Sequence, residues 1–254
     1  MKIALSIAGS DPTGGAGIQA DLKTFKSLNV YGIGVLTALT AQNTEGVFDI
    51  HDLPEGFFSK QLDALLKDIR PDACKTGMLY STEIIKVVAE KVKQYSLGSL
   101  VIDPVTASSS GVSLVKDEAL EILKDYLFPL ARIITPNIYE ASLFTGINIQ
   151  DEEDMKKAAV RLKESGPGAV VITGGHLKSV ALDLFFDGED FLLLENERLE
   201  GEYHGTGCVF SSVITAGLAL GYDVREAVVK AKEFVWTAMK SAVSLGKGMK
   251  VLNI

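Results

Sequence analysis

Short apolar runs alternate along the chain with longer segments in which apolar residues recur every three or four positions. The short runs have the length of buried strands and lie at residues 3–8, 32–40, 73–75, 100–102, 133–134 and 169–172. The longer segments have helical spacing and lie at residues 19–28, 54–69, 81–95, 116–127, 151–164 and 224–243, with further helices beginning near 137 and just after 208. This alternation predicts an α/β fold in which helices wrap a mostly parallel sheet.

Two segments depart from this alternation. Residues 47–53 alternate between apolar and polar side chains, which predicts a strand or a small β-flap. Residues 180–186 and 191–194 flank Asp187-Gly188-Glu189-Asp190, whose composition is typical of a hairpin turn. Because no linker, low-complexity tract or repeat interrupts the pattern, residues 1–254 are predicted to form one domain.

Composition narrows the expected partners and compartment. Hydrophobic residues are 47% and charged residues 23% of the chain, a balance typical of soluble globular proteins. The net charge of −8 disfavours wide contact with nucleic acid. No apolar run reaches transmembrane length, and residues 2–8 indicate a first strand rather than a signal peptide. The two cysteines, Cys74 and Cys208, are too few for a disulfide framework, so we expect a reducing, cytoplasmic location.

The segment from His204 to Phe210, His-Gly-Thr-Gly-Cys-Val-Phe, carries the most informative chemistry. A glycine-rich turn that opens a helix directs backbone N–H groups outward, and the helix dipole adds partial positive charge there. We therefore expect an anion site suited to phosphate. At this helix start Cys208 is expected to have a lowered pKa, and to be alkylated faster than Cys74, for which we expect only a packing role. The alternative is a tight loop followed by a small buried cysteine.

Polar side chains follow several of the predicted strands. Asp103 ends one strand, and Asn137 and Glu140 share a face at the start of a helix. Asp103 and Glu140 form a candidate Mg²⁺ pair, since Mg²⁺ is held by a few carboxylates while it keeps most of its waters. A helix N-cap followed by a first-turn acid explains Asn137 and Glu140 equally well.

Two further polar residues suggest ligand contacts. Asp21 lies near the start of a helix, where an acid either gains from the dipole or binds a ligand hydroxyl. Gln42 follows a buried strand, and its amide could pair with a heteroaromatic edge through a donor and an acceptor. The alternative for Gln42 is a loop residue that bonds to backbone.

Other motifs are weaker. Residues 15–20 match Gly-x-Gly-x-x-Ala, but the loop before them is too long for the dinucleotide fingerprint, and no Walker A sequence occurs. The three histidines lack metal-ligand spacing; we expect His51 at the surface, and His176 and His204 as loop anchors. Gly246-Lys247-Gly248 either wraps a nucleotide or caps the last helix.

Seven motifs occur together, in order, between Ile3 and about Gly248. They are Gly-Ser-Asp-Pro-Thr-Gly-Gly-Ala-Gly at 9–17, Ala-Gln-Asn at 41–43, Lys-Thr-Gly-Met at 75–78, Asp-Pro-Val at 103–105, Thr-Pro-Asn-x-x-Glu at 135–140, Gly-Gly-His at 174–176 and His-Gly-Thr-Gly-Cys at 204–208. As a set they closely resemble the hydroxymethylpyrimidine/phosphomethylpyrimidine kinase family, which belongs to thiamine biosynthesis and to the ribokinase-like superfamily.

The resemblance implies a three-layer α/β/α sandwich with a small β-flap, usually as a homodimer. It also implies an ATP- and Mg²⁺-dependent kinase. The acceptor would be a small pyrimidine, 4-amino-5-hydroxymethyl-2-methylpyrimidine, whose hydroxymethyl group is phosphorylated first and whose monophosphate is phosphorylated next. No nucleic acid or membrane partner is implied.

Site residues also follow from the resemblance. Gly205, Thr206 and Gly207 would form the anion hole, and Cys208 would occupy the position of a catalytic aspartate in sugar kinases of the superfamily. Gln42 would read the pyrimidine edge, with Asp21 near the hydroxymethyl side. The other acceptor residues would be Gly9, Gly77, Met78 and Val105. The nucleotide residues would be Asn137, Thr173, Gly175 and Lys247, with Asp103 and Glu140 at the metal.

Two departures from the family pattern bear on this assignment. Thr106 and Ser109 stand where many relatives carry methionine and then lysine or threonine, which affects the acceptor pocket. Thr173 stands where many relatives carry lysine, which removes one phosphate cation. Two alternative functions stay open. One is a pyridoxal or pyridoxine kinase of the same superfamily, whose acceptor is also a flat heterocycle with a hydroxymethyl arm. The other is a non-catalytic pyrimidine-binding regulator.

Overall fold

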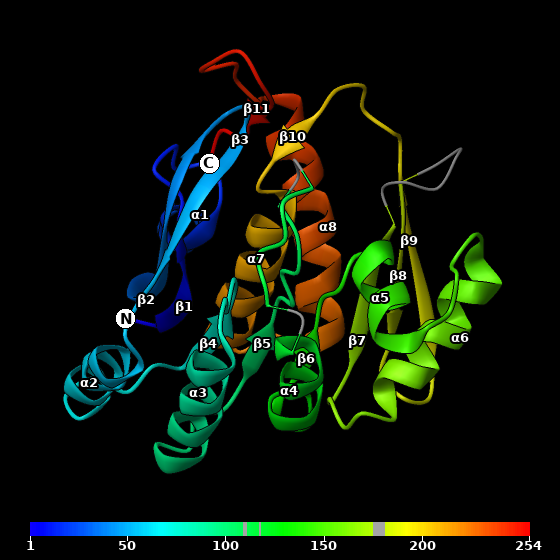
Figure 1. Ribbon diagram of the computed structural model, residues 1–254. Helices are drawn as coiled ribbons and strands as arrows, with labels where there is room; N and C mark the ends of the chain where they lie inside the picture. Colours follow the sequence, from blue (N-terminus) through cyan, green and yellow to red (C-terminus); the bar gives the residue numbers. More distant parts are fainter. Residues whose placement is uncertain (109–110, 117, 175–180) are drawn as a thin grey trace.

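One nine-stranded sheet runs through the protein, in the order β3-β2-β1-β4-β5-β6-β7-β8-β9 (Figure 1). The computed structural model describes residues 1–108, 111–116, 118–174 and 181–254. Strands β2 to β7 pair in parallel along this order, whereas β3 and β8 run antiparallel to their neighbours. The strands are β1 (Ile3–Ser10), β2 (Tyr31–Asn43), β3 (Gly46–Asp52), β4 (Ala73–Thr76), β5 (Leu100–Ile102), β6 (Ile133–Ile134), β7 (Val170–Gly174), β8 (Ala181–Phe186) and β9 (Phe191–Asn196).

Helices cover both faces of the sheet, which confirms the predicted three-layer α/β/α sandwich (Figure 1). One face carries α1 (Gly17–Ser27), α7 (Thr206–Leu220) and α8 (Val224–Lys240). The other carries α2 (Glu55–Leu66), α3 (Thr82–Gln94), α4 (Ala119–Tyr126), α5 (Ile138–Thr145), α6 (Glu152–Lys163) and the short 3₁₀ helix η1 (Phe128–Leu130). In the described part of the chain, no helix is both long and apolar enough to cross a lipid bilayer.

Alternate residues of each central strand pack against opposite helical layers. In β5, Leu100 and Ile102 join the core with α2 to α6, while Val101 joins the core with α7 and α8. All three side chains are buried. Because both strand faces are covered, such strands appear in the sequence as unbroken apolar runs.

The predicted β-flap is the hairpin formed by β2 and β3. It extends past the rest of the sheet and meets the C-terminal segment (Figure 1). Of the two alternatives for Gly246-Lys247-Gly248, the cap of the last helix is wrong, because α8 already ends at Lys240. Instead the Gly248 N–H donates to Thr44 Oγ1 at 3.2 Å, in the turn of the hairpin.

A second, two-stranded sheet was not predicted. Strand β10 (Tyr203–His204) pairs in parallel with β11 (Lys250–Val251), near the C-terminus. These strands are too short to produce a recognisable pattern. Because β10 ends at His204, this pairing positions the backbone directly before the Gly205–Cys208 turn, next to the flap.

The parallel strands bring the predicted site motifs to one edge. Strands β1, β2, β4, β5, β6 and β7 point the same way, so the segments that follow their carboxyl ends lie along the same side of the sheet. Open α/β sheets bind ligands at this edge.

Candidate functional site

Two glycine-rich loops contact each other at the carboxyl edge of the sheet. Gly205 precedes α7 with a φ of 84°, a left-handed conformation that favours glycine. A Cβ added at Gly205 would overlap the carbonyl oxygen of Gly15 in the loop after β1. A Cβ added at Gly15 would lie 2.8 Å from Cδ2 of His204. Glycine is therefore required here by backbone shape and by the close approach of the loops.

The N-terminus of α7 has the geometry of an anion site. The Val209 N–H donates to the Gly205 carbonyl at 2.9 Å and makes the first hydrogen bond of the helix. The backbone amides of Thr206, Gly207 and Cys208 precede that bond, as expected for the first turn. The 15-residue helix adds its dipole at the same end.

The expectation that Cys208 titrates below a free thiol is wrong. Burial raises the pKa of Cys208 to about 12, although Lys75 and a backbone hydrogen bond from Gly17 act to lower it. The nearby carboxylates of Asp103 and Asp21 raise it further. Cys208 is the third residue of α7 and is partly exposed, but these surroundings keep it a neutral thiol.

Burial likewise raises the pKa of Cys74 to about 12. Cys74 is buried in the apolar core, which confirms its packing role. Faster alkylation at Cys208 than at Cys74 is therefore expected from exposure alone, and not from a lowered pKa.

Lys75 is the residue that sequence reasoning missed. Its side chain is fully buried at the end of β4, where Nζ lies 2.6 Å from Asp21 Oδ1. Nζ also donates to the Cys208 carbonyl and to Ser212 Oγ, each at 3.2 Å. Burial lowers the pKa of Lys75, but the carboxylates of Asp21 and Asp103 outweigh it and the pKa is raised, so Lys75 is charged. The sequence signals were a lysine inside an apolar segment and its place in the Lys-Thr-Gly-Met motif at 75–78, in which no role was assigned to the lysine.

The structure does not support direct contact between Asp21 and a ligand hydroxyl. The Asp21 side chain is 0% exposed. One carboxylate oxygen accepts hydrogen bonds from Lys75 and Ser212, and the other accepts one from Ser6. Asp21 therefore supports the first turn of α7 from beneath.

Asp103 and Glu140 lie close enough to repel each other. Burial and the charge of Asp103 raise the pKa of Glu140 to about 8. Burial also raises the pKa of Asp103, although Lys75 and a hydrogen bond from Ser211 lower it. The capping interpretation of Asn137 and Glu140 is confirmed, since the two residues form a complete capping box.

The donor set at these carboxylates fits Mg²⁺. Two buried carboxylates repel each other, and the groups that lower the pKa of Glu140 are hydrogen-bond donors rather than cations. Each Glu140 oxygen already accepts one backbone N–H, from Thr106 at 3.1 Å and from Asn137 at 2.9 Å. In the described residues, no group of three or more His, Cys, Asp or Glu side chains could hold a metal ion. Such a site suits an ion that takes most of its ligands from water and phosphate.

Gln42 lies at the end of β2 in a polar network. Its amide contacts the His204 ring at 3.0 Å and Thr40 Oγ1 at 3.1 Å. His204 is buried and also contacts Asp11 Oδ2 at 2.8 Å. His204 is thus a loop anchor, as predicted, and His51 is exposed, as predicted. His176 lies outside the described residues.

The predicted acceptor residues Gly9, Gly77, Met78 and Val105 are brought together. A Cβ at Gly9 would lie 3.0 Å from Met78 Sδ, and one at Gly77 would lie 3.0 Å from the Ala8 side chain. Met78 and Val105 share an apolar cluster with Ala38, Val47 and Ile50 of the flap. Ala38 lies on β2, the strand that carries Gln42, so this apolar cluster adjoins that strand.

Of the predicted nucleotide residues, the structure describes Asn137, Thr173 and Lys247. Asn137 and Thr173 form a β-bridge, so β7 meets the start of α5. Lys247 is exposed on the segment that packs against the flap turn. Gly175 and Ser109 lie outside the described residues. Thr106, the other departure in that loop, is buried and donates its N–H to Glu140.

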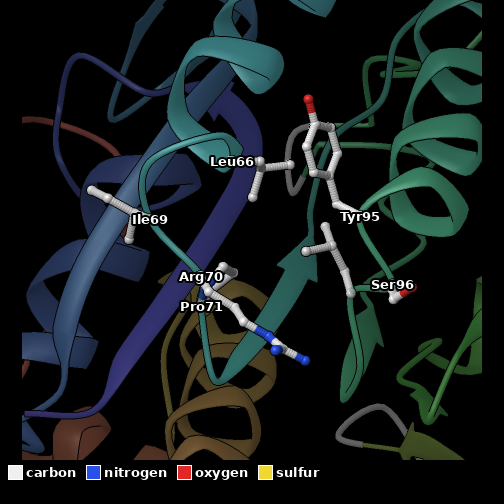
Figure 2. Close-up of a pocket in the computed structure, with 7 residues that line it drawn as sticks. Leu66, Ile69, Arg70, Pro71, Tyr95 and Ser96 are labelled. Atoms are coloured by element: carbon white, nitrogen blue, oxygen red, sulfur yellow. The ribbon is translucent and has the colours of Figure 1, made fainter.

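A cleft of about 310 Å³ opens far from these residues (Figure 2). Leu66, Ile69, Arg70, Pro71, Tyr95, Ser96 and Leu97 line it. These residues precede β4 and β5, so the cleft lies at the amino edge of the sheet. It contains none of the predicted site residues.

Comparisons with known proteins agree with this arrangement. The family model described as phosphomethylpyrimidine kinase matches residues 11–253. A thiamine biosynthesis bifunctional protein of Geobacter sulfurreducens is 48% identical over 98% of this chain, which spans 51% of that protein's length. A hydroxymethylpyrimidine/phosphomethylpyrimidine kinase of Bacillus subtilis is 43% identical, covering 96% of this chain and 92% of that protein. A crystal structure of Bacillus subtilis pyridoxal kinase with ADP superposes with a TM-score of 0.92 at 40% identity, covering 100% and 97% of the two chains.

Proposed function

The chain belongs to the phosphomethylpyrimidine kinase family, and we propose that it transfers the γ-phosphoryl group of ATP to 4-amino-5-hydroxymethyl-2-methylpyrimidine and then to the resulting monophosphate. Thiamine biosynthesis is the context that the relatives support. The observation that carries the proposal is the first turn of α7. Its Gly205–Cys208 amides lie at the carboxyl edge of the sheet, with Asp103 hydrogen-bonded to Ser211 one turn further along the helix.

Phosphoryl transfer depends mostly on positioning and on neutralising charge. In our proposal the amides of Thr206, Gly207 and Cys208 hold the oxygens of the transferred group, and the dipole of α7 adds to their effect. Gln42 holds the edge of the pyrimidine, while Gly9, Met78 and Val105 pack against its ring. Gly77, Asn137, Thr173, Gly175 and Lys247 stay predictions for the acceptor and nucleotide sites.

Asp103 and Glu140 would hold Mg²⁺ through its waters, and the ion would neutralise the phosphates of ATP. The raised pKa of Glu140 makes this site sensitive to pH, because the proton and the metal compete for one carboxylate.

The test is product analysis with ATP and Mg²⁺ against a panel of hydroxymethyl heterocycles. We expect ADP release with the hydroxymethylpyrimidine and with its monophosphate. Absence of both products, in a protein that is folded and binds ATP, would contradict the proposal.

The pyridoxal kinase of Bacillus subtilis, similar over the whole chain, favours pyridoxal or pyridoxine as the second candidate acceptor. A cysteine beside the acceptor could add reversibly to the aldehyde of pyridoxal. The same panel decides between them through the ratio of kcat/KM for pyrimidine and pyridoxal.

A non-catalytic pyrimidine-binding regulator would bind these ligands without releasing ADP. The presence of Asp103, Glu140 and the complete Gly-Thr-Gly-Cys loop in one chain argues against that role.

Replacing Cys208 by serine is expected to slow the single-turnover rate by less than about tenfold. The neutral thiol is a poor base, and the serine variant keeps all the amides of the loop. Rapid-quench measurement of ADP at saturating acceptor checks this. A loss of about 10²–10⁴-fold with unchanged acceptor affinity would instead identify Cys208 as the general base.

The apparent Mg²⁺ affinity is expected to rise with pH and to level off near pH 8. Below its pKa of about 8, Glu140 is protonated in the metal-free protein and must lose that proton to bind the ion. In the metal-free protein the raised pKa of Glu140 stabilises the folded state at low pH. This contribution to the free energy of unfolding is lost as pH rises to about 8. Mg²⁺ titrations of ADP release between pH 6 and 9 check the prediction.

The matched variants separate metal binding from helix capping. Glu140→Gln keeps an acceptor for the Asn137 N–H and should weaken Mg²⁺ binding and flatten its pH dependence. Asp151→Ala removes the N-cap of α6, at a cost of about 1 kcal/mol in stability, and should leave the Mg²⁺ titration unchanged. Unchanged metal dependence in both Glu140→Gln and Asp103→Asn would remove these residues from the site.

We also propose that the protein is a cytoplasmic homodimer. Both cysteines are free thiols, which suits a reducing compartment such as the cytoplasm.

The proposed dimer interface is on the flap and on α2, where the large apolar side chains of Leu39, Phe48 and Phe57 are exposed. Light scattering should give twice the chain mass, and Phe48→Glu should shift it toward the monomer; an unchanged dimer would place the interface elsewhere.

A further inference from the structure

The side-chain carboxylate of Asp11 acts only as a hydrogen-bond acceptor. Its carboxylate accepts from the Thr13 N–H at 2.9 Å, the Thr13 hydroxyl at 2.8 Å and the Ala16 N–H at 2.8 Å. Burial raises the pKa of Asp11, but the hydrogen bonds from His204 and Thr13 outweigh it and the pKa is lowered. The contact of 2.8 Å between Asp11 Oδ2 and His204 Nε2 therefore requires a proton on Nε2.

The other ring nitrogen of His204 is unprotonated. The His204 side chain is only 7% exposed, and Nδ1 is buried without a hydrogen-bond partner in the described part of the protein. A buried N–H without an acceptor is costly, whereas an unused lone pair is less so. His204 is thus the neutral tautomer with its proton on Nε2.

The proton on His204 Nε2 determines the orientation of the Gln42 side-chain amide, that is, which position its nitrogen and its oxygen occupy. The side-chain nitrogen of Gln42 lies 3.0 Å from His204 Nε2, and its oxygen lies 3.1 Å from Thr40 Oγ1. In that orientation an N–H of Gln42 faces the N–H of His204, which is repulsive, and the Thr40 hydroxyl proton is already donated to the Ser10 carbonyl at 2.8 Å. Exchanging the amide nitrogen and oxygen removes the repulsion. The Gln42 nitrogen then donates to Thr40 Oγ1, and the Gln42 oxygen faces the Nε2 proton of His204, which it shares with Asp11 Oδ2.

We infer that Asp11, His204 and Thr40 fix the donor and acceptor directions of Gln42, and so make the site selective for a 4-aminopyrimidine edge over a 4-oxopyrimidine edge. The inference rests on the proposed function. Once its oxygen bonds to His204 and its nitrogen to Thr40, the Gln42 amide has one N–H and one oxygen lone pair left to bond to a ligand. A 4-aminopyrimidine offers the complementary acceptor and donor, whereas the 4-oxo analogue offers them in reverse. His204 and Thr40 are positioning residues in this arrangement.

The tautomer of His204 can be measured without any activity. Nitrogen chemical shifts of the protein labelled with ¹⁵N-histidine identify the His204 signal as the one absent from His204→Leu. That signal should show a protonated Nε2 and a bare Nδ1 at neutral pH. A proton on Nδ1 of His204 would overturn the inference.

Selectivity is measured as the ratio of kcat/KM for the hydroxymethyl-4-aminopyrimidine and its 4-oxo analogue. The wild-type protein should prefer the amino compound by about 100-fold or more, since a mismatched edge leaves buried polar groups unpaired. His204→Leu should reduce the preference to below about tenfold, because the freed amide can turn to suit either edge. Thr40→Val, which removes the opposite anchor with little change in shape, should reduce it in the same direction. Thr24→Val removes a buried hydroxyl that bonds within α1, and should leave the ratio unchanged.

The outcomes separate this inference from the proposed function. Equal losses for both analogues in His204→Leu and Thr40→Val, with the ratio intact, would mean that these residues only support the fold, and would overturn the inference. A wild-type protein that phosphorylates both analogues equally would overturn it too. If the wild-type protein phosphorylates neither, the proposed function fails, and the ratio of calorimetric affinities for the two analogues decides the inference by the same criteria.

Discussion

Gly205→Ala is expected to lower kcat by about 10²–10³-fold while the protein stays folded, because it displaces the amides that hold the transferred phosphoryl group. The new Cβ would overlap the Gly15 carbonyl, and the left-handed φ of 84° is strained for alanine. The first turn of α7 must therefore move relative to the loop after β1. Steady-state ADP release, with circular dichroism to confirm folding, measures the effect.

Gly221→Ala is the matched control for this variant. Gly221 caps the opposite end of α7 with a φ of 96°, and nothing lies within 4 Å of a Cβ added there. It introduces similar backbone strain, of about 1 kcal/mol, without touching the site. Comparable activity losses in both variants would mean that general strain in α7, and not the Gly205 turn, is responsible.

Lys75→Met is expected to destabilise the protein by about 3–5 kcal/mol, because it leaves the Asp21 carboxylate buried without its cation. Denaturant unfolding at neutral pH measures the loss. Adding Asp21→Asn should recover part of it, since the double variant no longer buries the Asp21 charge without a cation, although Asp103 still lacks Lys75. Wherever folded protein can be obtained, kcat should fall more than acceptor affinity, because Lys75 also binds the Cys208 carbonyl.

Lys2→Met is the control for loss of a lysine–aspartate pair. The Lys2–Asp72 pair, with 2.7 Å between Nζ and Oδ1, is about half exposed at the lysine, so its loss should cost no more than about 1 kcal/mol. Equal effects of Lys75→Met and Lys2→Met would show that the buried pair contributes no more than a solvated one.

Burial affects the pKa of Lys75 and of Cys208 differently, although the two residues are in contact at the start of α7. Lys75 is surrounded by Asp21 and Asp103 and keeps its charge, whereas Cys208 stays neutral in the same environment. A helix N-terminus alone would have favoured the thiolate. Burial, with a smaller contribution from the nearby carboxylates, raises the pKa of Cys208 more than the helix N-terminus lowers it. We therefore expect positioning rather than base catalysis to dominate this site.

The sequence by itself determined the layered fold and the edge that carries the site. Buried parallel strands must be apolar on both faces, so a run such as Leu100-Val101-Ile102 predicts a buried strand from the sequence alone. The polar motifs directly follow these runs, and parallel strands place their carboxyl ends together. The flap followed from the period-two pattern of residues 47–53.

Only the tertiary structure decided the partners of individual polar groups. Hydrogen bonds such as Asp21–Lys75 and Asp11–His204 join residues 54 and 193 positions apart, and no local pattern encodes such pairings. The same holds for the pairing of β10 with β11 and for the contact between Gly248 and Thr44. The pKa of Cys208 also depends on which charges pack around it, a property that spacing along the chain does not contain.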